Sequence, residues 1–344
     1  MTQTREDFLA ARKLGIGGSD VAAILGLSRY RSALHCYLEK RGELPGEEEK
    51  WNEQGKMFGT RCEDIACKLF SEKTGRKIRK PGRTHTAKDY PFIRGNVDRI
   101  QWNTTRPAND QRGIVEAKWL DASQYTVWTK GGVPEGYYLQ LQHYLLCTGM
   151  QWGTFVVVFG GNKLEFFDVE RDEALIARLI EVEVEFWDRV QTGRPPDLSF
   201  DELGKALLTR LYPKQLPGKE MILDDEEATA KARRLFALID TVKAREKSLL
   251  ELEVWFKDKM GDAEKLLVPT VATFTWKAQS SIRIDVDKLR ADYPAVAKEC
   301  EKTSDSRVFR KTALKTAEID SVELEKDEMI VTAPQAARRF SFDE

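Results

Sequence analysis

The most informative feature of the sequence lies in residues 113–120 (GIVEAKWL), where apolar and charged side chains alternate from Val115 to Trp119. In an extended strand, successive side chains point to opposite faces of the sheet. Glu116 and Lys118 therefore share one face, while Val115, Ala117 and Trp119 share the other. The apolar flank predicts a central strand, so we expect the carboxylate and the ammonium to lie in one cleft.

The residues around this strand predict alternating helices and strands up to about residue 200. Apolar side chains at three- and four-residue spacing predict helices over 53–74, 137–147 and 171–192. Short apolar or β-branched runs predict strands over 93–102, 154–160 and 163–169. This order predicts an α/β (α+β) fold in which helices flank a central mixed sheet.

The Pro195–Pro196 pair marks the expected domain boundary. We predict a first domain over residues 1–200 and a mainly helical accessory region over 201–344. Apolar residues at helical steps across 224–260 fit either a helical hairpin packed on its own chain, which we favour, or an intermolecular coiled coil. Further strands are expected over 270–276, 281–284 and 307–311, with a helix over 285–293 that Asp285 caps.

Composition restricts where the protein works. Apolar residues make up 41% and charged residues 32% of the chain, enough for a sizeable core with a solvated surface. No segment approaches the roughly 18 apolar residues that span a bilayer, and the N-terminus lacks the apolar core of a secretory signal. The five cysteines include no CxxC pair, which favours reduced thiols. We expect a cytoplasmic protein without a membrane partner.

A run of basic residues is the main departure from an almost neutral net charge of -1. The segment between Lys73 and Lys88 carries seven Lys and Arg side chains and no acidic residue. A solvated surface and a phosphate-contacting surface explain this run equally well.

The cleft around Glu116 has the residue types that phosphodiester hydrolysis requires. A divalent ion held by carboxylates can activate water and relieve charge on the phosphate, and Mg²⁺ prefers one or two carboxylates with water and substrate oxygens. Asp98 lies 18 residues before Glu116, which leaves room for a hairpin that sets two strands side by side. The carbonyl oxygen of Ala117 is a further candidate ligand, and Lys118 would position water.

A Glu-x-Lys pair alone is common on solvated strands, so a catalytic role requires further polar residues in the same site. Glu63 lies on an upstream predicted helix and Gln140 on a downstream one. Without further information, we favour the interpretation of Gln140 as an ordinary polar residue on a helix face. The three histidines are too scattered for a zinc site, and no GxxxxGK[ST] segment indicates nucleotide binding.

Five segments between Leu14 and Gly149 resemble, in order, motifs of the phage lambda exonuclease and YqaJ viral recombinase group, a branch of the PD-(D/E)xK nucleases. The segments are GIGGSDVAAILG, FGTRCEDIACKLF, GNVDRI, EAK and WTKGGVPEGYYLQLQHYLLCTG. The resemblance implies a restriction-endonuclease-like core and an exonuclease that uses Mg²⁺, with Mn²⁺ as a substitute. It implies 5′→3′ resection of one strand of linear double-stranded DNA, in phage-type recombination by single-strand annealing.

The same resemblance implies partners and residue roles. Double-stranded DNA ends would be the substrate, a single-strand annealing protein the partner, and a trimeric ring the homo-oligomer, in the cytoplasm of a bacterial host. The implied metal ligands are Asp98, Glu116, the carbonyl oxygen of Ala117, and Glu63. Lys118 would orient the attacking water rather than act as a pure base, because a lysine beside carboxylates stays charged. Gln140 would bind water or substrate.

The N-terminal motif implies contacts to a terminal 5′-phosphate. Ser19 would contribute with the amides of a helix that it begins and that Gly26 ends, although a plain N-cap fits equally well. The implied additional phosphate partners are Arg12, Arg29, Arg31 and Asn96. The match is offset by one at Gly15, so Arg12 and Lys13 are alternatives.

The sequence departs from the family pattern near Asp98. Val97 and Arg99 stand where the family often has Pro and Gly, and Asn96 stands where a serine approaches the phosphate. Two other interpretations remain: a PD-(D/E)xK endonuclease acting on DNA, and a non-catalytic DNA-binding recombination scaffold. Intact Asp98, Glu116 and Lys118 argue against the scaffold.

Overall fold

The computed structural model describes residues 12–45, 53–302 and 307–312. The chain forms two compact units, Met1–Tyr212 and Pro213–Glu344, and each is described by itself. The sequence placed the division at residue 200, whereas helix α8 (Glu202–Leu211) belongs to the first unit. Leu207 of this helix is buried, and Arg210 Nε donates a hydrogen bond of 2.8 Å to the carbonyl oxygen of Pro45.

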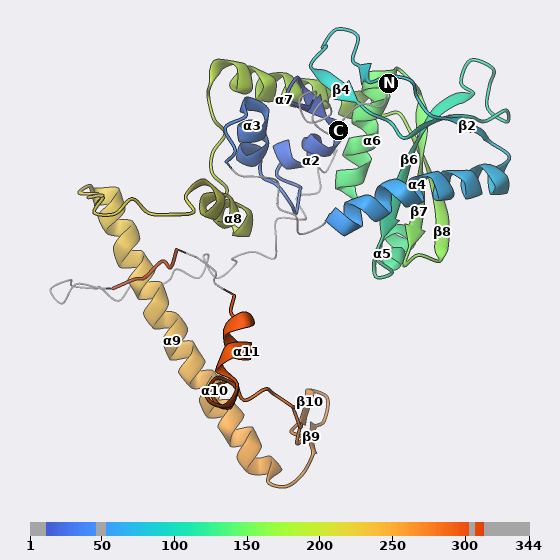
Figure 1. Ribbon diagram of the computed structural model, residues 1–344. Coiled ribbons are helices and arrows are strands. Elements are labelled where there is room, and N and C mark those ends of the chain that lie inside the picture. The colour runs from blue at the N-terminus through green and yellow to red at the C-terminus, as the bar shows by residue number, and fades with distance from the viewer. Residues whose placement is uncertain (1–11, 46–52, 303–306, 313–344) are drawn as a thin grey trace. The chain divides into compact units, whose positions relative to one another are not determined.

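A five-stranded mixed sheet forms the centre of the first unit (Figure 1). Its order is β2 (Lys77–Arg79), β5 (Arg99–Trp102), β6 (Arg112–Leu120), β7 (Trp152–Phe159) and β8 (Lys163–Glu170). The β6–β7 pair is parallel and the other pairs are antiparallel. Strand β6 therefore lies inside the sheet, as its apolar flank predicted, and every residue of β7 is buried.

Helices cover both faces of this sheet, and the alternation along β6 assigns its side chains to them. On one face, Val115 packs with Phe70 of α4 (Glu53–Thr74). On the other face, Ile114 packs with Leu141 of α6 (Glu135–Thr148) and Trp128 of α5 (Gln124–Gly131). Because β6 and β7 are parallel, α5 and α6 form the crossover between them. The sequence did not predict α5.

A smaller sheet adjoins this core. Its order is β1 (Ile16–Gly17), β4 (Ile93–Gly95) and β3 (His85–Thr86). The strand expected over 93–102 is therefore wrong as a single element, because β4 and β5 belong to different sheets. The apolar residues Ile93, Val97 and Ile100 are spaced by four and three, so one flat strand would place Ile100 on the opposite face from the other two. Asp98 lies in the break.

Three helices pack beside the smaller sheet: α2 (Gly18–Ile24), α3 (Ala33–Arg41) and α7 (Glu173–Thr192). Ser19 is not the N-cap of α2, as had been expected; Gly17 is. Asp20 reaches back, and its Oδ2 accepts a hydrogen bond of 2.9 Å from the Gly17 amide. A carboxylate at the third helical position therefore satisfies the backbone amide of the N-cap residue.

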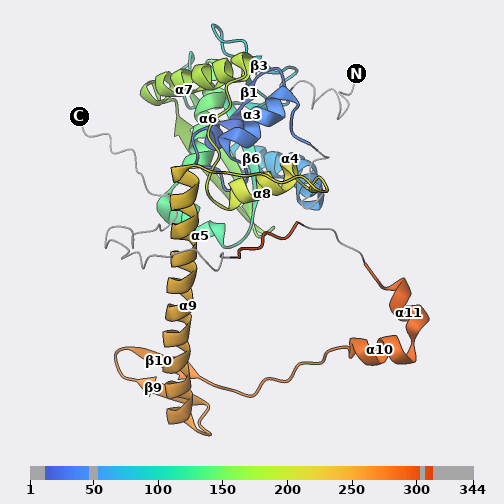
Figure 2. The same cartoon turned by 90° about the vertical axis from the view of Figure 1, so that its left-hand side faces the viewer.

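The second unit contains α9 (Glu226–Met260), the β9 (Lys265–Val268)–β10 (Ala272–Thr275) hairpin, α10 (Val286–Asp292) and α11 (Pro294–Glu299). Figure 2 shows α9 as one uninterrupted helix, so the expected helical hairpin is wrong. Its 35 residues contain no Gly or Pro that could end a helix before Gly261. Asp285 caps α10 as expected, whereas residues 281–284 and 307–311 form no strand.

Two general expectations can be compared with the described residues. None of their helices is both long and apolar enough to cross a membrane. All five cysteines are unpaired, in line with reduced thiols.

Candidate active site

Glu116 and Lys118 project from β6 toward α6, where they meet Gln140. Lys118 Nζ donates to Glu116 Oε1 at 2.8 Å and to Gln140 Oε1 at 3.0 Å. Gln140 Nε2 donates to Glu116 Oε1 and to the hydroxyl of Tyr144, both at 3.0 Å. The amide of Gln140 thus fixes both members of the Glu-x-Lys pair, which an ordinary surface glutamine would not do.

Asp98 reaches the same place from the break before β5. Its Oδ2 accepts a hydrogen bond of 2.8 Å from the amide of Ala117. The β5–β6 ladder ends at the Arg99–Val115 pair, so the Asp98 side chain replaces a missing backbone partner of Ala117. In an extended strand, the N–H and C=O of one residue point to the same side. The carbonyl oxygen of Ala117 is therefore directed toward Asp98, beyond the end of β5.

The electrostatics of this group are those of carboxylates that lack a cation. Burial, together with the neighbouring Glu116 and Glu63 carboxylates, raises the pKa of Asp98 to about 8. Burial also raises the pKa of Glu116, although Lys118 partly opposes the shift. Burial alone would lower the pKa of Lys118, but Glu116 raises it, so this lysine is an ammonium at neutral pH. The ammonium of Lys118 thus lowers the pKa of both adjacent carboxylates, Asp98 and Glu116.

The residues present fit a small, hard cation. Glu116 Oε2 is buried and lacks a hydrogen-bond partner. It lies beside Asp98, which forms no ion pair of its own among the described residues. Within the described ranges, no set of three or more His, Cys, Asp and Glu side chains is arranged to hold a metal ion. Two carboxylates and a backbone carbonyl suit Mg²⁺, which takes its remaining ligands from water and substrate.

Glu63 lies on α4 at the edge of this site, but its carboxylate forms an ion pair with the guanidinium of Arg99. The same guanidinium pairs with Asp64 and donates to the carbonyl oxygen of Asp98. Lys80 also pairs with Asp64, at 3.0 Å. Glu63 therefore has a cationic partner of its own, unlike Asp98.

A pocket of about 340 Å³ contains Glu63, Asp98, Glu116, Ala117 and Lys118 among its lining residues. The structure thus gathers the catalytic and metal-binding residues that the sequence proposed, with Gln140 hydrogen-bonded to two of them. The unpartnered oxygen of Glu116 belongs to a residue that lines this pocket, which makes the pocket the candidate active site.

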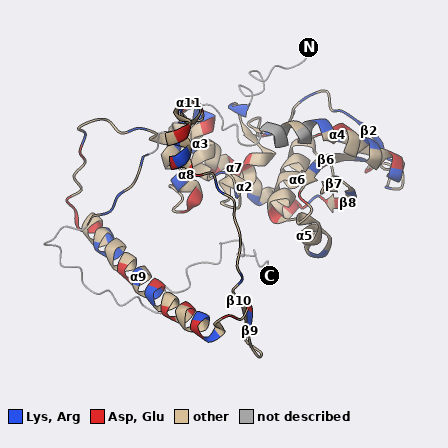
Figure 3. Ribbon diagram, turned by 60° about the horizontal axis from the view of Figure 1, so that its bottom comes forward, with Lys and Arg blue, Asp and Glu red and all other residues tan. Residues whose placement is uncertain are grey.

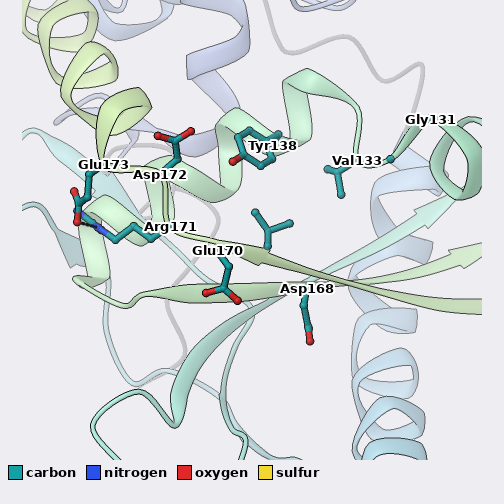
Figure 4. A pocket seen from close by; sticks show the side chains of 10 residues that line it. Gly131, Val133, Tyr138, Asp168, Glu170, Arg171, Asp172 and Glu173 are labelled. Carbon is teal, nitrogen blue, oxygen red and sulfur yellow. Dashed lines mark hydrogen bonds and ion pairs between the residues drawn. The ribbon is translucent and has the colours of Figure 1, made fainter. Parts of the chain in front are cut away.

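A larger pocket of about 720 Å³ lies elsewhere in the first unit, between the start of α6 and the end of β8 (Figure 4). The side chains of Asp168, Glu170, Asp172 and Glu173 lie along it, and Arg171 pairs with Glu173. Asp168 pairs with Arg76 and Glu170 with Arg106, both at 2.7 Å, so most of these carboxylates are neutralised. None of the expected site residues contributes to this pocket.

The start of α2 carries a buried charge cluster that includes two of the expected phosphate partners. Asp20 is 1% exposed and pairs with Lys40 at 2.6 Å, Arg31 at 2.9 Å and Arg12 at 3.3 Å. Burial alone would raise the pKa of Asp20, but these three cations hold it well below its usual range. Glu39 pairs with Arg31 at 2.7 Å and with Arg12 at 3.5 Å. Three positive and two negative side chains leave a net charge of +1.

The other expected phosphate partners are exposed. Ser19, at the second position of α2, has an exposed side chain, and its carbonyl oxygen accepts a hydrogen bond from Arg31. Arg29 and Asn96 are exposed. A Cβ on Gly18 would lie 2.6 Å from the Tyr144 ring and 3.1 Å from Cγ of Gln140, so the start of α2 lies against the active-site helix.

Three residues of these networks were not identified from the sequence. Tyr144 lies four residues after Gln140, so helical spacing could have linked the two. Arg99 was noted only as a departure from the family pattern. Lys40 gave no signal, because a buried lysine within an amphipathic helix looks like a surface lysine until its carboxylate partner is in place.

Part of the basic run forms a surface around Trp102. Arg79 of β2 and Arg112 of β6 come from the strands on either side of Trp102, with guanidinium carbons 5.7 and 5.9 Å from its ring centroid. None of Arg79, Arg83 and Arg112 forms an ion pair with another described residue. Burial lowers the pKa of His85, and Arg83 and Arg112 lower it further, which indicates a positive local field.

The chain resembles known proteins in sequence and in structure. Residues 7–151 match the family described as the YqaJ-like viral recombinase domain. The uncharacterized protein YqaJ of Bacillus subtilis is 31% identical over 310 residues, which cover 89% of this chain and 93% of that protein. The crystal structure of an alkaline exonuclease, LHK-Exo, from Laribacter hongkongensis is 22% identical, with a TM-score of 0.46 over 60% of this chain and 100% of that one.

A phage-related exonuclease from Haemophilus somnus is 14% identical, with a TM-score of 0.36 over 54% of this chain and 99% of that one. The assignment to a family rests on the Bacillus subtilis protein, because its similarity extends over most of both chains. The chain therefore belongs to the YqaJ-like viral recombinase family, which confirms the family expected from its sequence motifs.

Proposed function

We propose that this protein is a metal-dependent DNA exonuclease that resects one strand of linear duplex DNA in the 5′→3′ direction. The observation that carries the proposal is the convergence of Asp98, Glu116 and Lys118 in one pocket, with a buried Glu116 oxygen that lacks a partner. Family membership supports a role in phage-type recombination by single-strand annealing. The proposed partners are an annealing protein and two further copies of this chain in a trimeric ring, in the bacterial cytoplasm.

The chemistry divides between a bound ion and the side chains. Mg²⁺, with Mn²⁺ as a substitute, would make the phosphate more electrophilic and a water more acidic. Asp98, the free oxygen of Glu116 and the carbonyl oxygen of Ala117 would hold it. Lys118 is charged and held by two hydrogen bonds, so it would orient the attacking water and balance charge rather than remove a proton.

The hydrolysis itself explains why the enzyme could continue along a strand. Water adds to the phosphorus, and the bond between phosphorus and the 3′-oxygen of the terminal nucleotide breaks. A nucleoside 5′-monophosphate leaves, and the shortened strand carries a new 5′-phosphate. Each cycle therefore regenerates the end that the next cycle needs.

The cluster at the start of α2 is the proposed contact for that 5′-phosphate. Its net positive charge favours an anion, and the contact of Gly18 with Gln140 and Tyr144 keeps it beside the reaction site. Arg12, which pairs with Asp20 and Glu39, suits this role better than the exposed Lys13. The exposed Ser19, Arg29 and Asn96 would add contacts from the surrounding loops.

The basic surface around Trp102 is the proposed path of the DNA backbone. Arg112 lies four residues before Glu116 on the same strand face, about 13 Å away at the usual rise of a strand. Arginines on both sides of Trp102 suit contacts to backbone phosphates, which do not depend on the DNA sequence. The double variant Arg79→Gln/Arg112→Gln is expected to reduce the slope of log affinity against log salt by about 2.

The decisive experiment uses linear duplex DNA labelled separately at each end, with and without a 5′-phosphate. We expect Mg²⁺-dependent release of nucleotides from the 5′ label first, faster on phosphorylated ends, and no digestion of an intact circle. Chelation of the metal should stop the reaction. Cutting of the circle would instead indicate an endonuclease, and DNA binding without digestion would indicate a recombination scaffold.

A further inference from the structure

Arg99 is a buried cation next to a site that suits a metal ion. Its side chain is 6% exposed and lies on the α4 side of β5, since the paired residue Val115 packs against α4. One guanidinium nitrogen, Nη1, contacts Glu63 and the carbonyl oxygen of Asp98, and the other, Nη2, contacts Asp64. This arginine therefore spans two consecutive carboxylates of α4.

The charges around the pocket divide into separate pairs. Lys118 pairs with one oxygen of Glu116, and Arg99 pairs with Glu63. Asp98 receives only a backbone amide, and the second oxygen of Glu116 receives nothing. The need for a further positive charge is thus confined to Asp98 and Glu116, although Glu63 lines the same pocket.

We infer that Arg99 holds Glu63 out of the coordination of the metal, so that the site takes one ion between Asp98 and Glu116. This inference rests on the proposed function. If Glu63 turned to a metal ion, the guanidinium would keep the exposed Asp64 but lose the less exposed of its two carboxylates while facing a new dication, and breaking a buried ion pair is unfavourable. Arg99 is therefore a positioning residue, acting through Glu63, and it limits the number of ions and the strength of their binding.

The test counts Mn²⁺ ions bound per chain by titration calorimetry and by the electron paramagnetic resonance of free Mn²⁺. Wild type is expected to bind one tight ion, Asp98→Asn to lose it, and Glu63→Gln to bind within about twofold of wild type. Arg99→Gln releases the Glu63 charge, so it should bind a second ion or bind the first roughly tenfold more tightly, since one more carboxylate acts on a dication. The Glu63→Gln/Arg99→Gln double variant should return to the wild-type value.

Lys80→Gln is the matched control, because it also removes one positive charge beside Asp64 without touching Glu63. It should leave the number and affinity of bound ions unchanged. Arg99→Lys keeps a charge at the position and should resemble wild type. If Arg99→Gln fails to fold, as judged by thermal unfolding, Glu63→Gln decides alone, because Glu63 is partly exposed on α4.

Two results overturn the assignment of Arg99: loss of tight Mn²⁺ binding in Glu63→Gln to the extent seen in Asp98→Asn, or unchanged binding in folded Arg99→Gln. Both would leave the proposed nuclease intact. Absence of tight binding in wild type, or its persistence in Asp98→Asn, would overturn the proposed metal site together with this inference.

Discussion

The two units of the chain differ in how their helices are stabilised. In the first unit, both faces of the central sheet are covered, and residues such as Leu141, Phe155 and Trp152 are fully buried. In the described part of the second unit, Met260 and Ala297 are the only buried residues. Helix α9 is the longest helix described, yet Leu249 is 57% exposed.

Apart from its C-terminal end, where Phe256 stacks on Phe274 of β10, α9 is therefore expected to depend on local interactions. Asp225 caps its first turn, and pairs of opposite charge, such as Glu227–Lys231 and Glu253–Lys257, lie one turn apart along it. Figure 3 shows red and blue segments, which mark acidic and basic residues, interleaved along the ribbon of this helix. Such pairs contribute only about 0.2–0.5 kcal/mol each. Cooperative stability and chemistry are therefore expected to reside in the first unit.

The largest expected effect comes from a carboxylate of the site. Glu116→Gln removes a negative ligand and should lower the rate of Mg²⁺-dependent digestion roughly a thousandfold, about 4 kcal/mol in activation free energy. The rate is measured on end-labelled linear DNA. Glu251→Gln, on the exposed surface of α9, is the control and should leave the rate unchanged. Undiminished digestion by Glu116→Gln would show that the active site has been assigned wrongly.

The next effect concerns a buried ion pair that joins α6 to α7. His143 Nδ1 lies 2.9 Å from Glu183 Oε1, and Nε2 lies 2.9 Å from the carbonyl oxygen of Arg94. Both ring nitrogens face acceptors, so both carry protons. His143→Gln would leave Glu183 buried without its cation and should lower the free energy of unfolding by about 3–5 kcal/mol. Glu185→Gln, which breaks an exposed pair on α7, should cost under about 0.5 kcal/mol.

The stabilisation by the His143–Glu183 ion pair is expected to decrease as pH rises. Burial alone would lower the pKa of His143, but Glu183 raises it well above 6.5. The stabilisation is therefore complete below pH 6.5 and is lost as pH rises through the folded-state pKa. Urea unfolding from pH 6 to pH 10 should show the wild type and His143→Gln converging at the alkaline end. A constant difference would mean that the pair is not charged.

Replacing one leucine in each unit by alanine compares how much buried packing contributes to the stability of the two units. Leu141→Ala in α6 opens a cavity at a fully buried position and should cost about 2–5 kcal/mol. Leu249→Ala in α9 removes a mostly exposed side chain and should change the stability by less than about 0.5 kcal/mol. Both values come from chemical unfolding. A large loss for Leu249→Ala would show that another surface covers α9, as in an intermolecular coiled coil.

The smallest expected effect follows from removing the second unit. A chain ending at Tyr212 keeps every proposed site residue and all the described core clusters, so it should unfold cooperatively. It should digest linear DNA within about tenfold of the full chain, a difference of about 1.4 kcal/mol or less. Thermal unfolding and the end-label assay measure the two properties. Loss of digestion with the fold intact would assign part of the active site to the second unit.

The success of sequence interpretation varied with the range of the interactions involved. The alternation over 113–120 and the Asp285 cap are local, and the structure confirms the strand and the helix that they predicted. The helical hairpin was wrong because an apolar seam on one helix does not reveal whether the chain turns back. The strand over 93–102 was wrong because two sheets compete for neighbouring residues, and the break falls where Asp98 replaces a backbone partner of Ala117.

That Glu116 and Lys118 share a face could be inferred from the amino-acid sequence alone, because the two-residue period of a strand is fixed by covalent geometry. The sequence also determined the family, through the order of its motifs. The folded arrangement was needed to show which carboxylate forms an ion pair with which cation: Glu63 pairs with Arg99 and Glu116 with Lys118, whereas Asp98 accepts a hydrogen bond from a backbone amide. These pairings depend on distances between β5, β6 and α4, which no local pattern specifies, and electrostatic energies change steeply over such distances in a buried site.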